Sequence, residues 1–149
     1  MNKEKIAFIP RQYLAVIAVL LAIMMSVLDG TIMNIALPTL AHDFDVTPST
    51  AIWIVNAYQL VITMTLLSFA SLGDIYGYRR IFLIGISIFV GASLACTLST
   101  SFWMLTAARV IQGFGAACVM SVNTALIRLI YPPQILGRVM GVNAMVVAV

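Results

Sequence analysis

Residues 12–36 read QYLAVIAVLLAIMMSVLDGTIMNIA. A helix rises about 1.5 Å per residue, so roughly 20 apolar residues are needed to cross the hydrocarbon core of a bilayer. This run is long enough, and it contains one acidic side chain, Asp29, and no basic one. Continuous apolarity predicts a membrane-spanning helix, because a barrel strand would be shorter and would alternate polar with apolar residues.

Further runs of the same kind follow along the chain, at 51–72, 81–98, 102–126 and, incompletely, 139–149. The 149 residues are 62% hydrophobic and only 9% charged, with a mean hydropathy of +1.08. So few charges cannot cover the surface of a soluble domain. The sequence therefore predicts an all-α integral membrane fold, with an N-terminal segment at 1–11 and a partial transmembrane bundle over 12–149. Because the fifth run stops within a span, we expect a truncated or partial sequence.

The charged residues between the runs predict an orientation. Basic residues occur before the first run, between the second and third, and after the fourth: Lys3, Lys5, Arg11, Arg79, Arg80, Arg128 and Arg138. The segment 38–50 carries Asp43 and Asp45 but no lysine or arginine. The positive-inside rule therefore places the N-terminus in the cytoplasm and 38–50 outside, in a plasma or inner membrane. A cleaved signal peptide is not expected, because the first run is too long and includes Asp29.

Several other classes of protein are excluded by what the chain contains. It has no HExxH, G-x-S-x-G or phosphate-loop motif, and His42 is its only histidine, so we expect no enzyme. Cys96 and Cys118 lie inside apolar runs without CxxC spacing, which predicts packing residues, no metal site and no cofactor. The basic residues gather at the ends of the runs instead of forming one face, which argues against a nucleic-acid partner.

The acid within the first run is the strongest functional signal. Intramembrane acids usually face a bundle interior or a watery cavity and serve ion or proton pathways. Residues 28–38, LDGTIMNIALP, resemble the signature L-D-x-T-[IV]-x-N-x-A-L-P of the fourteen-span drug:proton antiporters of the major facilitator superfamily, and residues 53–60 resemble that family's second helix. The resemblance implies that Asp29 acts in proton coupling and cation recognition, with Asn34 in the same motif. Met33, one turn beyond Asp29, is expected to line a pocket.

The segment between the second and third runs, 70–80, is similar to the superfamily's loop motif G-x-L-A-D-R-x-G-R-K. The matching positions are Leu72, Asp74, Gly77 and Arg79. The departures are Ala70, Ile75 and Tyr78. Gly73 and Gly77 permit a tight turn or close helix approach, and Asp74 is expected to face a helix N-terminus or an arginine as part of a gate. A plain turn with cytoplasmic arginines remains the alternative.

Residues 105–117, LTAARVIQGFGAA, match the superfamily's fourth-helix motif L-x-x-x-R-x-x-Q-G-x-G-A-A at every defined position. Four of these residues share one helix face, at i, i+3, i+4 and i+7: Arg109, Gln112, Gly113 and Ala116. This face presents a cation and an amide above small residues, and Gly113, Gly115 and Ala116 are expected to pack against another helix. A nucleotide-binding glycine motif is excluded, because the segment lies inside a helix and Cys118 occupies the last motif position.

The resemblance implies a fold of two six-span halves, each an inverted pair of three-helix repeats, of which this chain supplies the first repeat and part of the second. Asp29 and Arg109 would lie at similar depth, so we expect them to pair. The first hypothesis is export of drug-like organic compounds driven by the proton gradient. The alternatives are an exporter of a metabolite or amino acid, and a membrane scaffold that transports nothing. The expected partners are the lipid bilayer, a small-molecule substrate and the remainder of the transporter.

Overall fold

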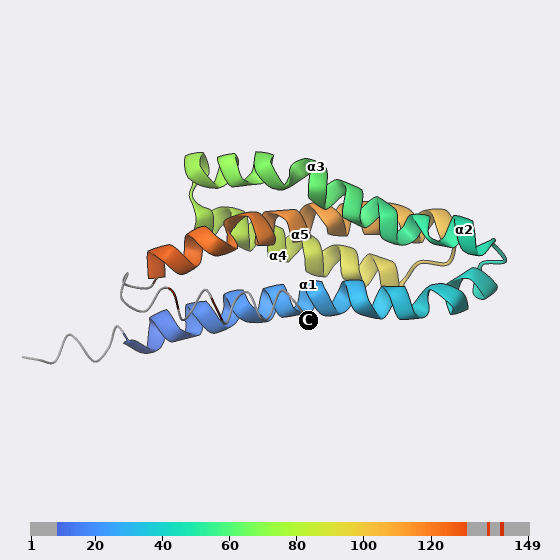
Figure 1. Cartoon of the computed structure of the whole chain (residues 1–149), viewed down its shortest axis with the longest axis horizontal. Helices are drawn as coiled ribbons and strands as arrows, with labels where there is room; N and C mark the ends of the chain where they lie inside the picture. The colour runs from blue at the N-terminus through green and yellow to red at the C-terminus, as the bar shows by residue number, and fades with distance from the viewer. Residues whose placement is uncertain (1–8, 131–136, 138–140, 142–149) are drawn as a thin grey trace, which may run out of the picture.

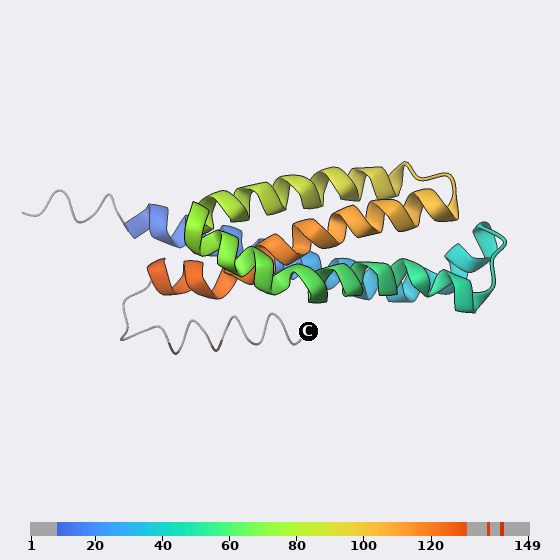
Figure 2. The same cartoon turned by 90° about the horizontal axis from the view of Figure 1, so that it is seen from above.

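A computed structural model describes residues 9–130 together with residues 137 and 141. Its helices are α1 (Ile9–Asp43), α2 (Pro48–Ala51), α3 (Trp53–Tyr76), α4 (Tyr78–Thr97) and α5 (Phe102–Ile130), and the described residues contain no strand. The four long helices run alongside one another (Figures 1 and 2). Four segments are long and apolar enough to cross a membrane: Ile17–Asp43, Pro48–Tyr76, Tyr78–Thr97 and Phe102–Asn123. The all-α class expected from the sequence is confirmed.

The first helix is longer than its apolar run. It continues through Pro38 to Asp43, although 38–50 was expected to be a connecting segment. Proline removes one backbone donor and crowds the preceding turn, so packing must support the helix beyond it. Leu40 provides such packing, because it contacts the buried cluster that contains Ile54 and Phe102.

The helix of the second run, α3, is preceded by a short helix, α2, which shares only Ala51 with that run. The short α2 begins after Thr47, whose hydroxyl accepts a hydrogen bond from the Thr50 amide at 3.3 Å, and α3 follows after Ile52. Asp45 precedes this cap with a φ of 50°, a conformation that aspartate tolerates better than most residues. The fifth expected run, 139–149, lies outside the described residues apart from residue 141.

The core of the bundle is centred on α5, which packs against both α3 and α4. A Cβ on Gly113 would lie 3.0 Å from the Tyr58 carbonyl oxygen of α3, and one on Gly115 would lie 2.6 Å from the Phe89 amide nitrogen of α4. Ala116, the residue after Gly115, is fully buried. Small residues therefore let α5 approach two helices closely at the same level.

A tight turn joins α3 directly to α4. Its central residue, Gly77, has a φ of +93°, which residues with a side chain rarely adopt. A Cβ on the nearby Gly73 would lie 2.9 Å from the ring of Tyr78 and 2.9 Å from Val122 of α5. The backbone at Gly77 and the packing at Gly73 therefore both favour glycine at this turn.

Candidate functional site

A buried polar network joins α1 to α5. The Nη1 of Arg109 donates hydrogen bonds to Asp29 Oδ2 at 2.5 Å and to Gln112 Oε1 at 2.8 Å. The Nε2 of Gln112 donates to Asp29 Oδ1 at 3.0 Å. Gln112 therefore bridges the two charged groups, and both oxygens of the Asp29 carboxylate are bonded to α5.

Arg109 is held more deeply than its acidic partner. Its side chain is 3% exposed, whereas that of Asp29 is 21% exposed. The guanidinium carbon lies 5.5 Å from the centroid of the Tyr58 ring, within the range of a cation–π contact. Since a buried charge must be compensated by a partner and by hydrogen bonds, Asp29 and Gln112 on one side and Tyr58 on the other fix the position of this cation.

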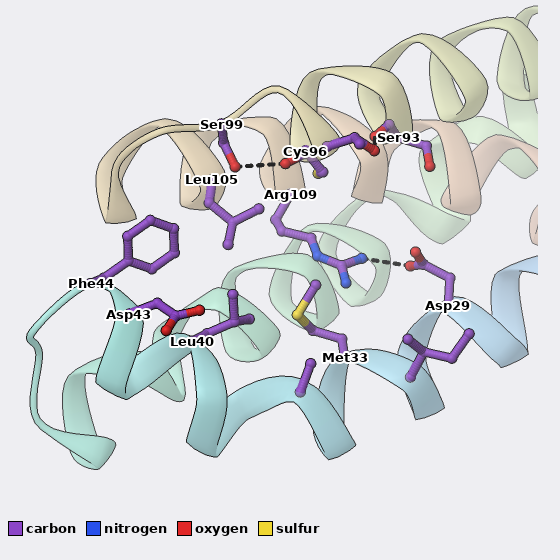
Figure 3. Close-up of a pocket in the computed structure, with 13 residues that line it drawn as sticks. Asp29, Met33, Leu40, Asp43, Phe44, Ser93, Cys96, Ser99, Leu105 and Arg109 are labelled. Carbon is purple, nitrogen blue, oxygen red and sulfur yellow. Dashed lines mark hydrogen bonds and ion pairs between the residues drawn. The ribbon is translucent and has the colours of Figure 1, made fainter.

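The carboxylate of Asp29 borders a cavity of about 530 Å³ between α1, α4 and α5, which we call the vestibule. Figure 3 shows Asp29 and Arg109 at one end of it, and Asp43 and Phe44 toward the other. Residues that line the vestibule include Asp29, Met33, Asp43, Ser93, Cys96 and Arg109. Met33 thus lines the same cavity as Asp29, and its part in substrate binding stays a prediction.

A second, smaller cavity of about 240 Å³ lies between α1, α3 and α5. Its lining includes Ser26, Thr31, Asn34, Tyr58, Gln59 and Met120. Asn34 follows Met33 directly, but each helical residue is rotated by about 100° from the previous one, so the two side chains line different cavities. The sequence grouped Asn34 with Asp29, whereas the structure places them on different faces of α1.

The loop motif forms a local contact. Asp74, in the last turn of α3, accepts a hydrogen bond from the hydroxyl of Tyr78, the first residue of α4. Among the side chains that the structure describes, Asp74 makes no ion pair with an arginine, and Arg79 is exposed. The physical reason is that Ile75 and Tyr78 occupy the two positions where the motif has arginine. Asp74 therefore contacts the side chain of the first residue of α4, and its role in gating stays a prediction.

Two residues of the site were not identified from the sequence. Tyr58 entered the sequence analysis only as part of the segment 53–60. A phenol hydroxyl inside an apolar run usually has a polar or cationic partner, and this rule could have identified Tyr58 as a site residue. Cys96 was expected to be a packing residue, but it lines the vestibule, with its Sγ 3.6 Å from Gln112 Oε1. Cys118 is buried in the core between α4 and α5.

A family model and several known proteins match most of this chain. Residues 19–149 match the family model described as Major Facilitator Superfamily. The chain is 57% identical over 141 residues to an Escherichia coli (strain K12) protein named uncharacterized transporter YebQ, covering 95% of this chain and 31% of that protein. It is 34% identical to the riboflavin transporter RibZ of Clostridioides difficile (strain 630), over 93% of this chain and 30% of that protein.

The drug efflux pump JefA of Mycobacterium tuberculosis (strain ATCC 25618 / H37Rv) is 41% identical over 130 residues, which is 87% of this chain and 26% of that protein. The chain therefore spans less than a third of the length of these curated relatives. The relatives are named as transporters or efflux pumps, in agreement with the absence of enzyme motifs from the sequence.

Proposed function

This chain belongs to the major facilitator superfamily, and on that premise we propose that it is the N-terminal part of an exporter of drug-like or lipophilic organic compounds, driven by exchange for protons. The observation that supports the proposal is the buried pair of Asp29 and Arg109, which is bridged by Gln112 and lines the vestibule. Removing two charges from water is costly, and a scaffold gains nothing from that cost. An exchanger needs a carboxylate that can bind and release a proton.

The proposed mechanism begins with neutralisation of Asp29 by a proton or by a cationic substrate. Arg109 then loses its ionic partner but keeps its hydrogen bond to Gln112 and its contact with Tyr58. The attraction that joins α1 to α5 is weakened, which changes the relative free energies of the inward-facing and outward-facing states. A ligand shifts such an equilibrium only through different affinities for the two states, and protonation of Asp29 supplies that difference.

The proposal is tested with full-length protein in liposomes. We expect an imposed proton gradient to drive movement of a lipophilic cationic dye against its concentration gradient, and an ionophore that collapses the proton gradient to stop this movement. Liposomes without protein control for passive distribution of the dye. Dye movement that persists at the same rate after the gradient is collapsed would contradict proton coupling.

A second candidate function is export of a metabolite. It is favoured by one observation, the 34% identity to a protein named as a riboflavin transporter. In the same liposomes, a panel that includes riboflavin and several lipophilic cations distinguishes the two candidates. Transport of riboflavin with no transport of any cation would replace the drug-export proposal with this one.

The orientation of the helices across the membrane can be tested separately. We propose that the N-terminus and the turn at Gly77 face the cytoplasm, and that the α1–α2 connection faces outward, because the basic residues lie on the first side. Ser49 is exposed in α2. In full-length protein whose other cysteines are replaced, a Ser49→Cys variant should react with a membrane-impermeant thiol reagent added to intact cells. Reaction only after permeabilisation would reverse the orientation.

Coupling between Asp29 and Arg109 is expected to appear in a double-mutant cycle. Arg109→Ala alone leaves Asp29 without its ionic partner, and Asp29→Ala alone leaves a buried cation, whereas the double variant leaves neither charge. The double variant should therefore lose less folding stability than the two single losses added together, by roughly 0.5–3 kcal/mol for residues in direct contact. Thermal unfolding of the four purified full-length proteins measures the cycle. Strictly additive losses would mean that the contact contributes nothing.

A further inference from the structure

The vestibule reaches from the α1–α2 end of the bundle to the Asp29 carboxylate. On α1 it is lined by Asp29, Met33, Leu40 and Asp43, which lie on one helix face because they are separated by three, four or seven residues. Asp43, near the end of α1, is 62% exposed at its side chain. The vestibule therefore has a carboxylate at each end: an exposed one where α1 ends and a largely buried one at the network (Figure 3).

Polar side chains form the smaller part of the vestibule wall and give water places to bind. Ser93, Thr97 and Ser99 line it from the side of α4 and the following turn. A volume of about 530 Å³ has room for many water molecules, each of which takes about 30 Å³ in the liquid. The Nε of Arg109 is buried and has no hydrogen-bond partner within the described part of the chain. Because this nitrogen is closed to solvent, water in the vestibule meets the network at the Asp29 carboxylate, whose side chain is 21% exposed.

Within the network, the side chain of Asp29, the proposed proton acceptor, is more exposed than that of Arg109. The side chain of Asp29 is 21% exposed and that of Arg109 only 3%. The other titratable groups that face Asp29 are Arg109 of α5, Tyr58 of α3 and Cys96 of α4, with Asp43 further along α1. Of these, Asp29 and Asp43 are the carboxylates, so a proton entering this cavity meets an acid at its mouth and another at its base.

We propose that the vestibule is the route by which protons from the outer side reach Asp29, without passing through the cavity that contains Asn34. A hydronium ion in the vestibule gives its proton to a carboxylate oxygen of Asp29 and becomes water. Asp29 becomes neutral, and Arg109 keeps its own protons and its hydrogen bond to Gln112. The inference rests on the proposed function and its orientation, and it adds the path of the proton.

The two cavities lie on different faces of α1, and the contact between Arg109 and Tyr58 lies between them. Arg109 lines the vestibule, whereas Tyr58 lines the second cavity. An organic compound in the second cavity would not have to leave before a proton arrived through the vestibule. Separate access allows the two ligands to act on the same network from opposite sides.

The chain contains a natural probe of the route in Cys96. In full-length protein with Cys96 as its sole cysteine, we expect a charged, membrane-impermeant thiol reagent added from outside to modify Cys96 and to inhibit export. A protein with Cys118 alone is the control, because Cys118 is 2% exposed and lies outside the vestibule. Reaction of Cys96 only from the cytoplasmic side would overturn the proposal. Protection of Cys96 from both sides, as when another part of the full-length protein fills the vestibule, would also overturn it.

A second experiment obstructs the route and needs no reactive cysteine. Ser93→Phe places a large ring in the vestibule, and we expect proton-driven export to fall by about tenfold or more, because slow access to a closed site limits the cycle. Equilibrium binding of the dye at fixed pH should change little. Gly91→Phe is the matched control: it lies two residues away on α4, and a Cβ there meets no atom within 4 Å. It should retain near-normal export.

The outcomes separate this inference from the proposed function. If Asp29→Asn abolishes proton-driven export but Ser93→Phe leaves it unchanged, Asp29 is the coupling residue and the proton takes another path. If Asp29→Asn leaves proton-driven export intact, Asp29 is not the coupling residue, and the inferred route to it is overturned while the proposed function stands. If the unsubstituted protein shows no proton-driven export, the proposed function itself is wrong. If Ser93→Phe abolishes both export and dye binding, the vestibule serves the organic compound, and the proposal is overturned.

Discussion

Full-length protein carrying Asp29→Asn is expected to lose proton-coupled export by about 100-fold, which corresponds to roughly 2.8 kcal/mol of lost coupling. Asparagine has almost the same shape as aspartate and retains one oxygen that can accept from Gln112 or Arg109. It cannot bind or release a proton near neutral pH. The variant should therefore enter the membrane and bind a cationic dye weakly, while an imposed proton gradient no longer moves the dye.

Asp45→Asn is the matched control for this change. Asp45 is exposed, lies outside both cavities and has a positive φ that asparagine tolerates. Its replacement removes one carboxylate from the same side of the bundle without touching the network. Export driven by a proton gradient should be unchanged in this control. Export by Asp29→Asn that keeps its normal dependence on pH would contradict the assignment of Asp29.

The sequence predicted which segments are helical better than it predicted where each helix begins and ends. Long apolar runs require helices in a membrane, because every backbone group must be paired within the segment, and this requirement does not depend on the neighbours. The ends depend on local packing. The continuation of α1 past Pro38 is supported by Leu40, which packs against the cluster that contains Ile54 of α3 and Phe102 of α5. No pattern within a single run predicts a contact between different helices.

The candidate site, like the helices, was predicted from the sequence only in part. Asp29 and Arg109 could be matched because two costly charges at similar depth in an apolar chain must find partners. The structure brings them into direct contact, and Gln112, which belongs to the same motif as Arg109, bonds to both. The position of Asn34 beside a different cavity depends on how α1 is rotated against α3 and α5, and a single sequence contains no information on that rotation. The functional roles of these residues remain predictions.

The largest expected effect on folding is at Gly115. An added Cβ would lie 2.6 Å from the Phe89 amide nitrogen and 2.8 Å from the Gly85 carbonyl oxygen, so it meets the backbone of α4 at two points. Flexible side chains can turn away from such a contact, but a helix backbone can only move as a unit. Gly115→Leu should therefore separate α5 from α4 and cost about 3 kcal/mol or more, at the upper end of the usual range for overpacking.

Gly91→Leu is the control for Gly115→Leu, because it is the same substitution in a neighbouring helix of the same bundle. A Cβ at Gly91 meets no atom within 4 Å, and leucine favours a helix over glycine by somewhat less than about 1 kcal/mol. Gly91→Leu should leave the unfolding temperature of the purified full-length protein unchanged or slightly higher, whereas Gly115→Leu should lower it sharply or abolish the yield of folded protein. Equal unfolding temperatures for the two variants would mean that α4 and α5 do not approach as closely as the structure requires. In that case Arg109 and Gln112, carried by the same helix as Gly115, would also lose the fixed position that the Asp29 contact depends on.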